Sequence, residues 1–262
     1  MIIKRILLNI FKIFGLKISI NKLSSNTNWK YLDLNSWIPF NDENNKIFKI
    51  YNEGLIKSES TKQDNTFKQI RFYSLMVIVE NILKSKKIEN FAECGCWRGH
   101  STYCISAILK KNNFKKTFFV FDSFEGGLSR KIDKDLNKNR YLQNISEIKN
   151  QKNYFYSDFN KVKKLLNHFE FVKIFKSWIP KDFDKISSYK FSFVHLDVDL
   201  YEPTLKSLEF FYPRLLEGGI IVCDDYNSSD FPGASLAIDE FLLKNKFTYF
   251  YEVPLGGCII IK

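Results

Sequence analysis

The chain has 262 residues, of which 45% are hydrophobic, and its formal net charge is +11. This length can bury one large core, which 26 Phe and 13 Tyr make aromatic, and it leaves room for an N-terminal extension. The five cysteines lack paired CxxC spacing, which argues against a structural zinc site or a disulfide framework and favours a reducing compartment. The lysines are scattered among asparagines, so the charge predicts no specific nucleic-acid site and suits anionic substrates or membrane surfaces equally.

Residues 1–63 are predicted to form an N-terminal extension made of a basic amphipathic helix and a cover segment. The first 22 residues contain no acid, their apolar stretches are too broken for a membrane-spanning helix, and no signal-peptide cleavage site follows. Arg5, Asn9 and Lys12 recur at helical spacing and leave a broad apolar face. Two interpretations stay open: a helix packed on the domain or on a second subunit, and an interfacial helix on an anionic membrane. We expect a cytoplasmic protein, with peripheral contact at the inner face of the membrane left open.

Residues 64–262 are predicted to form one α/β domain. The predicted helices cover residues 67–85, 101–110, 158–167 with Ser157 as N-cap, 204–215 and 234–245. The predicted strands cover residues 88–94, 116–122, 171–175, 191–197, 219–224, 248–253 and 258–261. Strands that alternate with helices predict a doubly wound, mostly parallel, Rossmann-like sheet of seven strands. Pro254, Gly256 and Gly257 split the last two strands, which predicts an antiparallel C-terminal hairpin.

The segment FAECGCWRGHS at residues 91–101 carries a glycine turn directly after the first strand, which is typical of a nucleotide-type cofactor site. A pyrophosphate needs the closer spacing GxGxxG, whereas three bulky residues separate Gly95 from Gly99. S-adenosylmethionine carries no phosphate and needs one tight turn with nearby carboxylates, which Glu93 supplies. Asp122 ends the second strand, where it is placed for ribose hydroxyls. The alternative for Glu93 is a helix-capping or salt-bridging acid.

Three acids follow later strands: Asp197 after the fourth, and Asp224 and Asp225 after the fifth. Adjacent strands lie about 4.8 Å apart, so these acids can converge on one ion. Oxygen ligands without His or Cys select Mg²⁺, Mn²⁺ or Ca²⁺ over Zn²⁺. Such an ion would lower the pKa of an attacking hydroxyl and align it with a methyl group. The alternative is that the acid pair caps the next segment and Asp197 forms a salt bridge.

The predicted general base is Asp197 or Asp199, acting beside the metal. His195 lies inside the fourth strand and is predicted to be a hydrogen-bonded core histidine, and His100 to pack against the cofactor turn. Residues 126–156 are polar and basic, and they are predicted to form a mobile lid. Their charge is either a solvated face or a recognition surface for phosphate on a nucleotide-linked sugar or a lipid-linked glycan.

Four motifs, ECGCWRGHS, FDSFEGG, HLDVDLYEPT and GGIIVCDDYN, occur in this order and resemble the macrocin/mycinamicin-type sugar O-methyltransferases over roughly residues 67–247. The resemblance implies a class I methyltransferase fold and S-adenosylmethionine- and magnesium-dependent methylation of a sugar hydroxyl in a bacterial glycan or glycosylated metabolite. It implies metal ligation by Asp197, Asp224 and Asp225. The cofactor contacts that it implies are Glu93, Gly95, Ser101, Asp122, Ser123, Ser177 and Trp178, the last two near the adenine.

Two other functions stay open on the sequence: an O-methyltransferase for a catechol-like small diol, and a non-catalytic protein of this fold that binds a membrane surface or a partner. Intact acids at Glu93, Asp122, Asp197, Asp224 and Asp225 speak against lost catalysis. The acceptor is predicted to be a small molecule or a glycan, and a homo-oligomer is left open.

Overall fold

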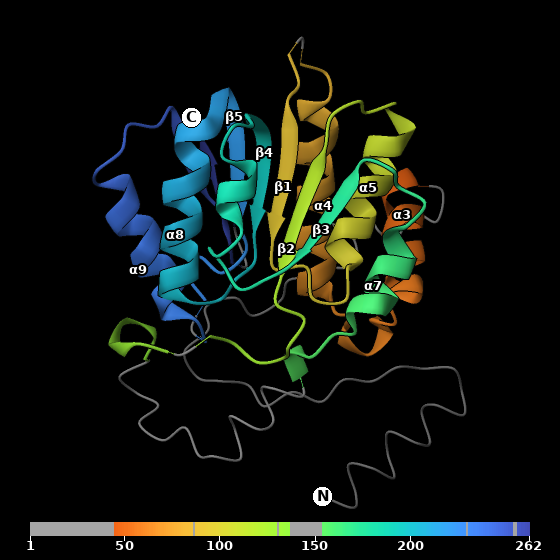
Figure 1. Ribbon diagram of the computed structural model, residues 1–262, viewed down its shortest axis with the longest axis horizontal. Coiled ribbons are helices and arrows are strands. Elements are labelled where there is room, and N and C mark those ends of the chain that lie inside the picture. The colour runs from red at the N-terminus through yellow and green to blue at the C-terminus, as the bar shows by residue number, and fades with distance from the viewer. Residues whose placement is uncertain (1–44, 86, 130, 137–153, 229, 254–255) are drawn as a thin grey trace, which may run out of the picture. The chain divides into compact units, whose positions relative to one another are not determined.

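A computed structural model describes residues 45–262 except positions 86, 130, 137–153, 229 and 254–255 (Figure 1). The predicted helix at residues 1–22, most of the cover segment and the centre of the predicted lid lie outside the described residues. Among the described helices, none combines the length and the apolar character that crossing a membrane requires. The described chain forms a seven-stranded sheet in the order β3-β2-β1-β4-β5-β7-β6.

The sheet confirms the predicted doubly wound architecture. Its strands are β1 Asn90–Cys94, β2 Phe118–Asp122, β3 Val172–Lys176, β4 Phe191–Leu196, β5 Leu215–Cys223, β6 Tyr249–Glu252 and β7 Cys258–Ile261. The first five strands run parallel, and β7 pairs antiparallel with both β5 and β6. The carboxyl ends of five parallel strands therefore meet at one edge, the edge at which open α/β sheets bind ligands.

Helices cover both faces of the sheet. They are α3 Lys46–Lys57, α4 Thr66–Ile82, α5 His100–Lys111, α7 Phe159–Leu166, α8 Tyr201–Phe211 and α9 Pro232–Leu242. Helices α3, α4 and α5 pack against one another and α8 packs on α9, and Figure 1 shows α8 in front of the sheet and α4 behind it. Helix α3 is not predicted from the sequence and lies in the stretch predicted as a cover segment. Its N-cap is Asn45, and it buries Ile47, Tyr51 and Leu55.

The five predicted helices begin within three residues of their predicted starts, and two of the differences have a local cause. The N-cap of α7 is Asp158 and not Ser157, because the Asp158 carboxylate accepts hydrogen bonds from the backbone N–H groups of Asn160 and Lys161 at 2.8 and 3.2 Å. Helix α8 begins at Tyr201, three residues before the predicted start. Its first turn contains Pro203, which is tolerated there because N–H groups in the first turn of a helix have no helical partner, so the N–H that proline lacks is not missed.

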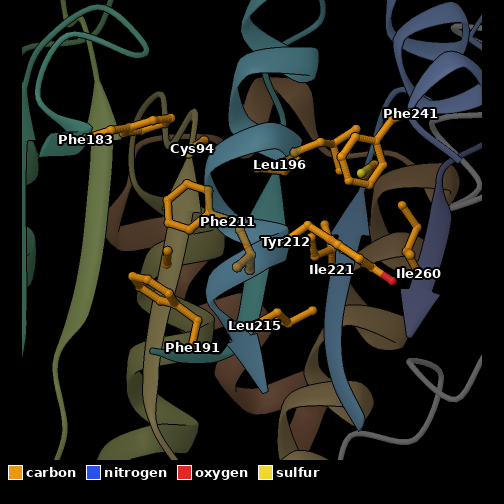
Figure 2. Packing of buried hydrophobic residues seen from close by; sticks show 14 of the residues in the cluster. Cys94, Phe183, Phe191, Leu196, Phe211, Tyr212, Leu215, Ile221, Phe241 and Ile260 are labelled. Atoms are coloured by element: carbon orange, nitrogen blue, oxygen red, sulfur yellow. The ribbon is translucent and has the colours of Figure 1, made fainter. Parts of the chain in front are cut away.

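The core is aromatic, as the composition predicts. Figure 2 shows Phe211 at the end of α8 beside Phe191 of β4, and the two rings meet edge to face at 5.0 Å. Each fully buried Phe contributes roughly 1.5–3 kcal/mol of apolar transfer free energy. All five cysteines are free and buried. This packing holds β1, β4 and β5 rigidly beneath the residues that follow their carboxyl ends.

Gly95, the first residue after β1, joins the strands on both sides. Its N–H donates to Phe121 O at 2.8 Å, and Asp197 N–H donates to Cys94 O at 2.9 Å. Gly95 has φ +83°, and a Cβ at this position would lie 1.8 Å from Asp197 O. The close approach of β1 and β4 therefore excludes every side chain here.

Replacing Gly95 with Ala is expected to cost about 3 kcal/mol or more of unfolding free energy, because the methyl group adds a backbone collision to the cost of positive φ. Gly218→Ala is the matched control, since Gly218 has φ +74° and a methyl group there would meet no atom within 4 Å. This control is expected to cost about 1–2 kcal/mol. Urea unfolding measures both variants, and equal losses would contradict the close approach.

Candidate active site

A cavity of about 1190 Å³ opens at the carboxyl ends of the parallel strands and is also lined by α4. It contains ten of the eleven predicted site residues: Gly95, Ser101, Asp122, Ser123, Ser177, Trp178, Asp197, Asp199, Asp224 and Asp225. These residues end or follow five different strands or begin α5, so the fold alone brings them together. The residue left out is Glu93, which is fully buried.

Asp122 fixes the glycine turn. Its Oδ2 accepts hydrogen bonds from the backbone N–H groups of Cys96 and Trp97 at 2.9 and 2.8 Å, and its Oδ1 accepts one from Phe124 at 2.8 Å. Burial raises the pKa of Asp122, while these three hydrogen bonds act in the opposite direction. Each carboxylate oxygen accepts more than one hydrogen bond, so Asp122 can hold the turn and still accept from a hydroxyl in the cavity.

A flat surface lies at the end of β3, next to Asp122. Ser177 N–H donates to Asp122 O at 2.8 Å, which ties the residue after β3 to β2. Trp178 follows, with its indole 37% exposed and its Nε1–H donating to Glu125 Oε2 at 2.9 Å. Ser123 also lines this part of the cavity. An exposed indole held in one orientation provides a stacking surface for a planar ring.

Behind the turn, a chain of charged contacts connects β1, β4, β5 and α4. The Glu93 carboxylate accepts a hydrogen bond from the Thr102 hydroxyl and lies 2.9 Å from His195 Nδ1. His195 Nε2 lies 3.2 Å from Asp224 Oδ1, and Arg71 Nη1 lies 3.2 Å from Asp224 Oδ2. Glu93 thus lies behind the cavity wall, in the salt-bridge arrangement that the sequence left as its alternative. The prediction of a hydrogen-bonded core histidine at His195 is confirmed.

The charges in this chain support one another. Burial opposes a charge on His195, but the carboxylates of Asp224 and Glu93 raise the pKa of its imidazole well above the usual value. Burial likewise opposes a charge on Asp224, but Arg71 and His195 lower its pKa to about 2. Asp224 is therefore an ionised carboxylate with both oxygens held in place at the cavity wall.

The other acids gather beside Asp224. Carboxylate oxygens of Asp197, Asp199 and Asp225 all lie within 4.8 Å of one another. The Asp199 backbone N–H donates to Asp225 Oδ2 at 2.9 Å, and Asp199 has φ +62°. Backbone strain of this kind is frequent at functional sites, and aspartate tolerates it better than most residues. The structure therefore adds Asp199 to the predicted acid set and leaves Asp224 at its edge, paired with Arg71 and His195.

Burial and mutual repulsion dominate this acidic cluster. They raise the pKa values of Asp197, Asp199 and Asp225 well above the ordinary value of an aspartate. A bound cation would relieve the repulsion, and the donors are carboxylate oxygens without a thiolate or imidazole. Such a set fits Mg²⁺, Mn²⁺ or Ca²⁺ rather than Zn²⁺.

Sequence reasoning missed two cations on α4. Lys68 and Arg71 both line the cavity, whereas the prediction treated this helix only as a packing element. The signal was present in the sequence: two basic residues three positions apart lie on one face of the helix, in its first half. Arg71 is paired with Asp224, while the Lys68 ammonium has no ion pair or hydrogen bond with any described residue and lies by the Phe72 ring.

The strand order, the antiparallel C-terminal pair and the glycine turn define a class I methyltransferase fold. Residues 65–251 match the family model for macrocin O-methyltransferase (TylF), and the chain belongs to this family. The resemblance of the four sequence motifs is thereby confirmed.

Named relatives and a solved structure are similar to this chain. An 8-demethyl-8-(2,3-dimethoxy-alpha-L-rhamnosyl)-tetracenomycin-C 4'-O-methyltransferase of Streptomyces olivaceus is 26% identical over 162 residues, 60% of each chain. A demethyldecarbamoylnovobiocin O-methyltransferase of Streptomyces niveus is 25% identical over 182 residues, 66% of each chain. The match thus spans 60% to 66% of these relatives. The structure of the O-methyltransferase NovP superimposes with a TM-score of 0.59 at 20% identity, covering 73% of this chain and 79% of NovP.

Replacing Lys68 with Met is expected to stabilise the cofactor-free protein at pH 7, by on the order of 1–3 kcal/mol, because it removes a buried ammonium without an anionic partner. Burial lowers the pKa of Lys68 from 10.5 to about 8. Between these values the unfolded state binds more protons than the folded state, so wild-type stability rises with pH. The advantage of the variant should therefore shrink above pH 8. Urea unfolding at pH 7 and pH 9.5 measures it, and an equal advantage at both would contradict the expectation.

Proposed function

We propose that this chain is an S-adenosylmethionine-dependent, divalent-metal-assisted O-methyltransferase that methylates a sugar hydroxyl of a glycan or glycosylated metabolite. One observation carries the proposal: the Asp122-held turn and the acidic cluster open into the same cavity. A methyl donor at the turn and a hydroxyl at the acids are then neighbours, as a direct transfer requires.

The strand order supports a linear arrangement of the donor along the sheet edge. Adenine would lie by Trp178 and Ser177 after β3, and the ribose hydroxyls by Asp122 after β2. The methionine part would then cross the turn at Gly95 after β1. The next strand is β4, followed by the acids. Adjacent strands are about 4.8 Å apart, so each part of the donor meets the end of a different strand. The methyl group would then lie on the side of the acidic cluster.

The aspartates are proposed to have two roles, metal binding and proton acceptance. Asp197, Asp224 and Asp225 are proposed to hold the divalent ion, with Asp224 oriented by Arg71 and His195. When bound, this ion would supply Lewis-acid activation of the acceptor hydroxyl. Asp199, whose N–H is anchored on Asp225, is proposed to accept the hydroxyl proton, with Asp197 beside it as the second candidate for this role.

The sugar acceptor is supported by the named relatives and by the cavity itself. Both relatives reported above are named as O-methyltransferases, one for a rhamnosyl-bearing compound and the other for a novobiocin precursor. Phe67, Phe155 and Phe231 also line the cavity. Aromatic faces suit the apolar faces of sugar rings.

Replacing Asp199 with Asn is expected to lower kcat about 100- to 10,000-fold, because it removes the proton acceptor. The amide keeps the shape of the side chain and tolerates positive φ, so the affinity for S-adenosylhomocysteine should stay within about twofold. Methyl transfer from labelled S-adenosylmethionine to a panel of nucleotide sugars and glycosides, before and after chelation and with Mg²⁺ restored, measures the effect.

Asp184→Asn is the matched control, because Asp184 is an exposed acid outside the cavity. It should leave turnover unchanged. Wild-type turnover that persists in chelator, or an Asp199→Asn enzyme as active as this control, would contradict the proposed mechanism.

A further inference from the structure

Lys68, in the first turn of α4, is a buried cation without a counter-ion. The residue is only 8% exposed, and its ammonium has no hydrogen bond or ion pair with any described residue. It lies instead by the Phe72 ring, whose centroid is 5.3 Å from Nζ. Burying an unpaired ammonium costs free energy that the folded protein must recover elsewhere. Because Lys68 lines the cavity, an anion bound there can pair with the ammonium and offset this cost.

The groups around Lys68 leave its charge uncompensated. Asp64, Cys104 and Asp197 favour the ammonium through space, and Arg71 opposes it, while burial outweighs them all and lowers the pKa of Lys68 to about 8. Asp64 accepts hydrogen bonds from Tyr51 and Gln69, and Asp197 belongs to the acidic cluster. Both carboxylates therefore have other partners.

The other ionisable groups near the start of α5 do not supply a second cation. Burial, together with the charge of Lys68, lowers the pKa of His100 to about 3, so its imidazole is neutral. Arg71 is paired with Asp224 at 3.2 Å. Lys68 is therefore the cation of this part of the cavity that stays available to a ligand, among the residues that the structure describes.

The position of Lys68 identifies which part of the donor it meets. Phe72 joins Lys68 to His100, because its ring lies 4.4 Å from the imidazole. His100 is the first residue of α5 and directly follows the glycine turn. Lys68 thus lies by the turn after β1, between the β2 end proposed for the ribose and the acids after β4. In the linear arrangement proposed above, this place belongs to the amino-acid part of the donor.

We propose that Lys68 binds the α-carboxylate of the methionine part of S-adenosylmethionine. This inference rests on the proposed function, which supplies the donor. In a cavity rich in aspartates, an anionic donor group needs a cation of its own, and a partly buried ammonium–carboxylate pair is strong enough to orient the tail. The Lys68 charge destabilises the cofactor-free protein and is compensated when the donor binds.

The test compares two ligands that share the nucleoside. S-adenosylhomocysteine carries the carboxylate, whereas 5'-methylthioadenosine lacks the whole amino-acid part. Calorimetry on the full chain is expected to show that Lys68→Met weakens S-adenosylhomocysteine about 10- to 100-fold and 5'-methylthioadenosine less than about twofold. Lys68→Gln should behave in the same way, and urea unfolding confirms that both variants fold. Lys62→Met is the control for lost net charge, since Lys62 is exposed just before α4, and it should change neither affinity.

Three results would overturn the inference. Equal weakening of both ligands would assign Lys68 a structural role. Unchanged affinity for S-adenosylhomocysteine, with a raised acceptor KM, would assign its ammonium to an anionic group of the acceptor. Failure of the wild-type chain to bind either nucleoside would overturn the proposed function, and this inference with it; the first two results leave that function intact.

Discussion

The active-site architecture depends on the buried chain Glu93–His195–Asp224–Arg71. It joins the ends of β1, β4 and β5 to α4 through contacts of 2.9 to 3.2 Å. Buried ion pairs add little net stability because desolvation offsets their attraction, but removing one partner leaves an uncompensated charge. The main effect of these four contacting side chains is therefore to fix one another's positions. They hold the ionised Asp224 at the cavity wall, and at the other end of the chain Glu93 lies behind the glycine turn.

The cavity contains two different electrostatic environments. On one side Asp197, Asp199 and Asp225 raise one another's pKa values and attract a cation. On the other side Lys68 is a buried cation that attracts an anion. A positively charged methyl donor with a carboxylate tail complements both sides. Gly95 makes the two environments neighbours, because the absence of a side chain lets β1 and β4 approach.

The sequence predicted the sheet and most of the cavity lining because those signals are local. Asp122, Asp197 and Asp224 each follow an apolar strand, and parallel strands bring their carboxyl ends to one edge. Glu93 shows the limit of this reasoning: it belongs to the turn motif, but its side chain points to His195, a partner 102 positions away. Lys68 and Arg71 were missed because helix periodicity identifies a buried face without showing that part of it borders a cavity. The N-cap of α7 was misassigned by one residue, since Ser157 and Asp158 are both favourable caps and only backbone geometry decides between them.

The central claim is that one cavity holds the methyl donor at the β1–β2 end and a divalent ion at the acids after β4 and β5. A crystal structure with S-adenosylhomocysteine and Mn²⁺, recorded at the manganese absorption edge, tests it most directly. The account predicts an anomalous peak among Asp197, Asp224 and Asp225, beside Asp199, with the ligand sulfur facing it and the ribose on Asp122. A peak elsewhere, no peak at saturating Mn²⁺, or the nucleoside bound away from Asp122 would contradict it.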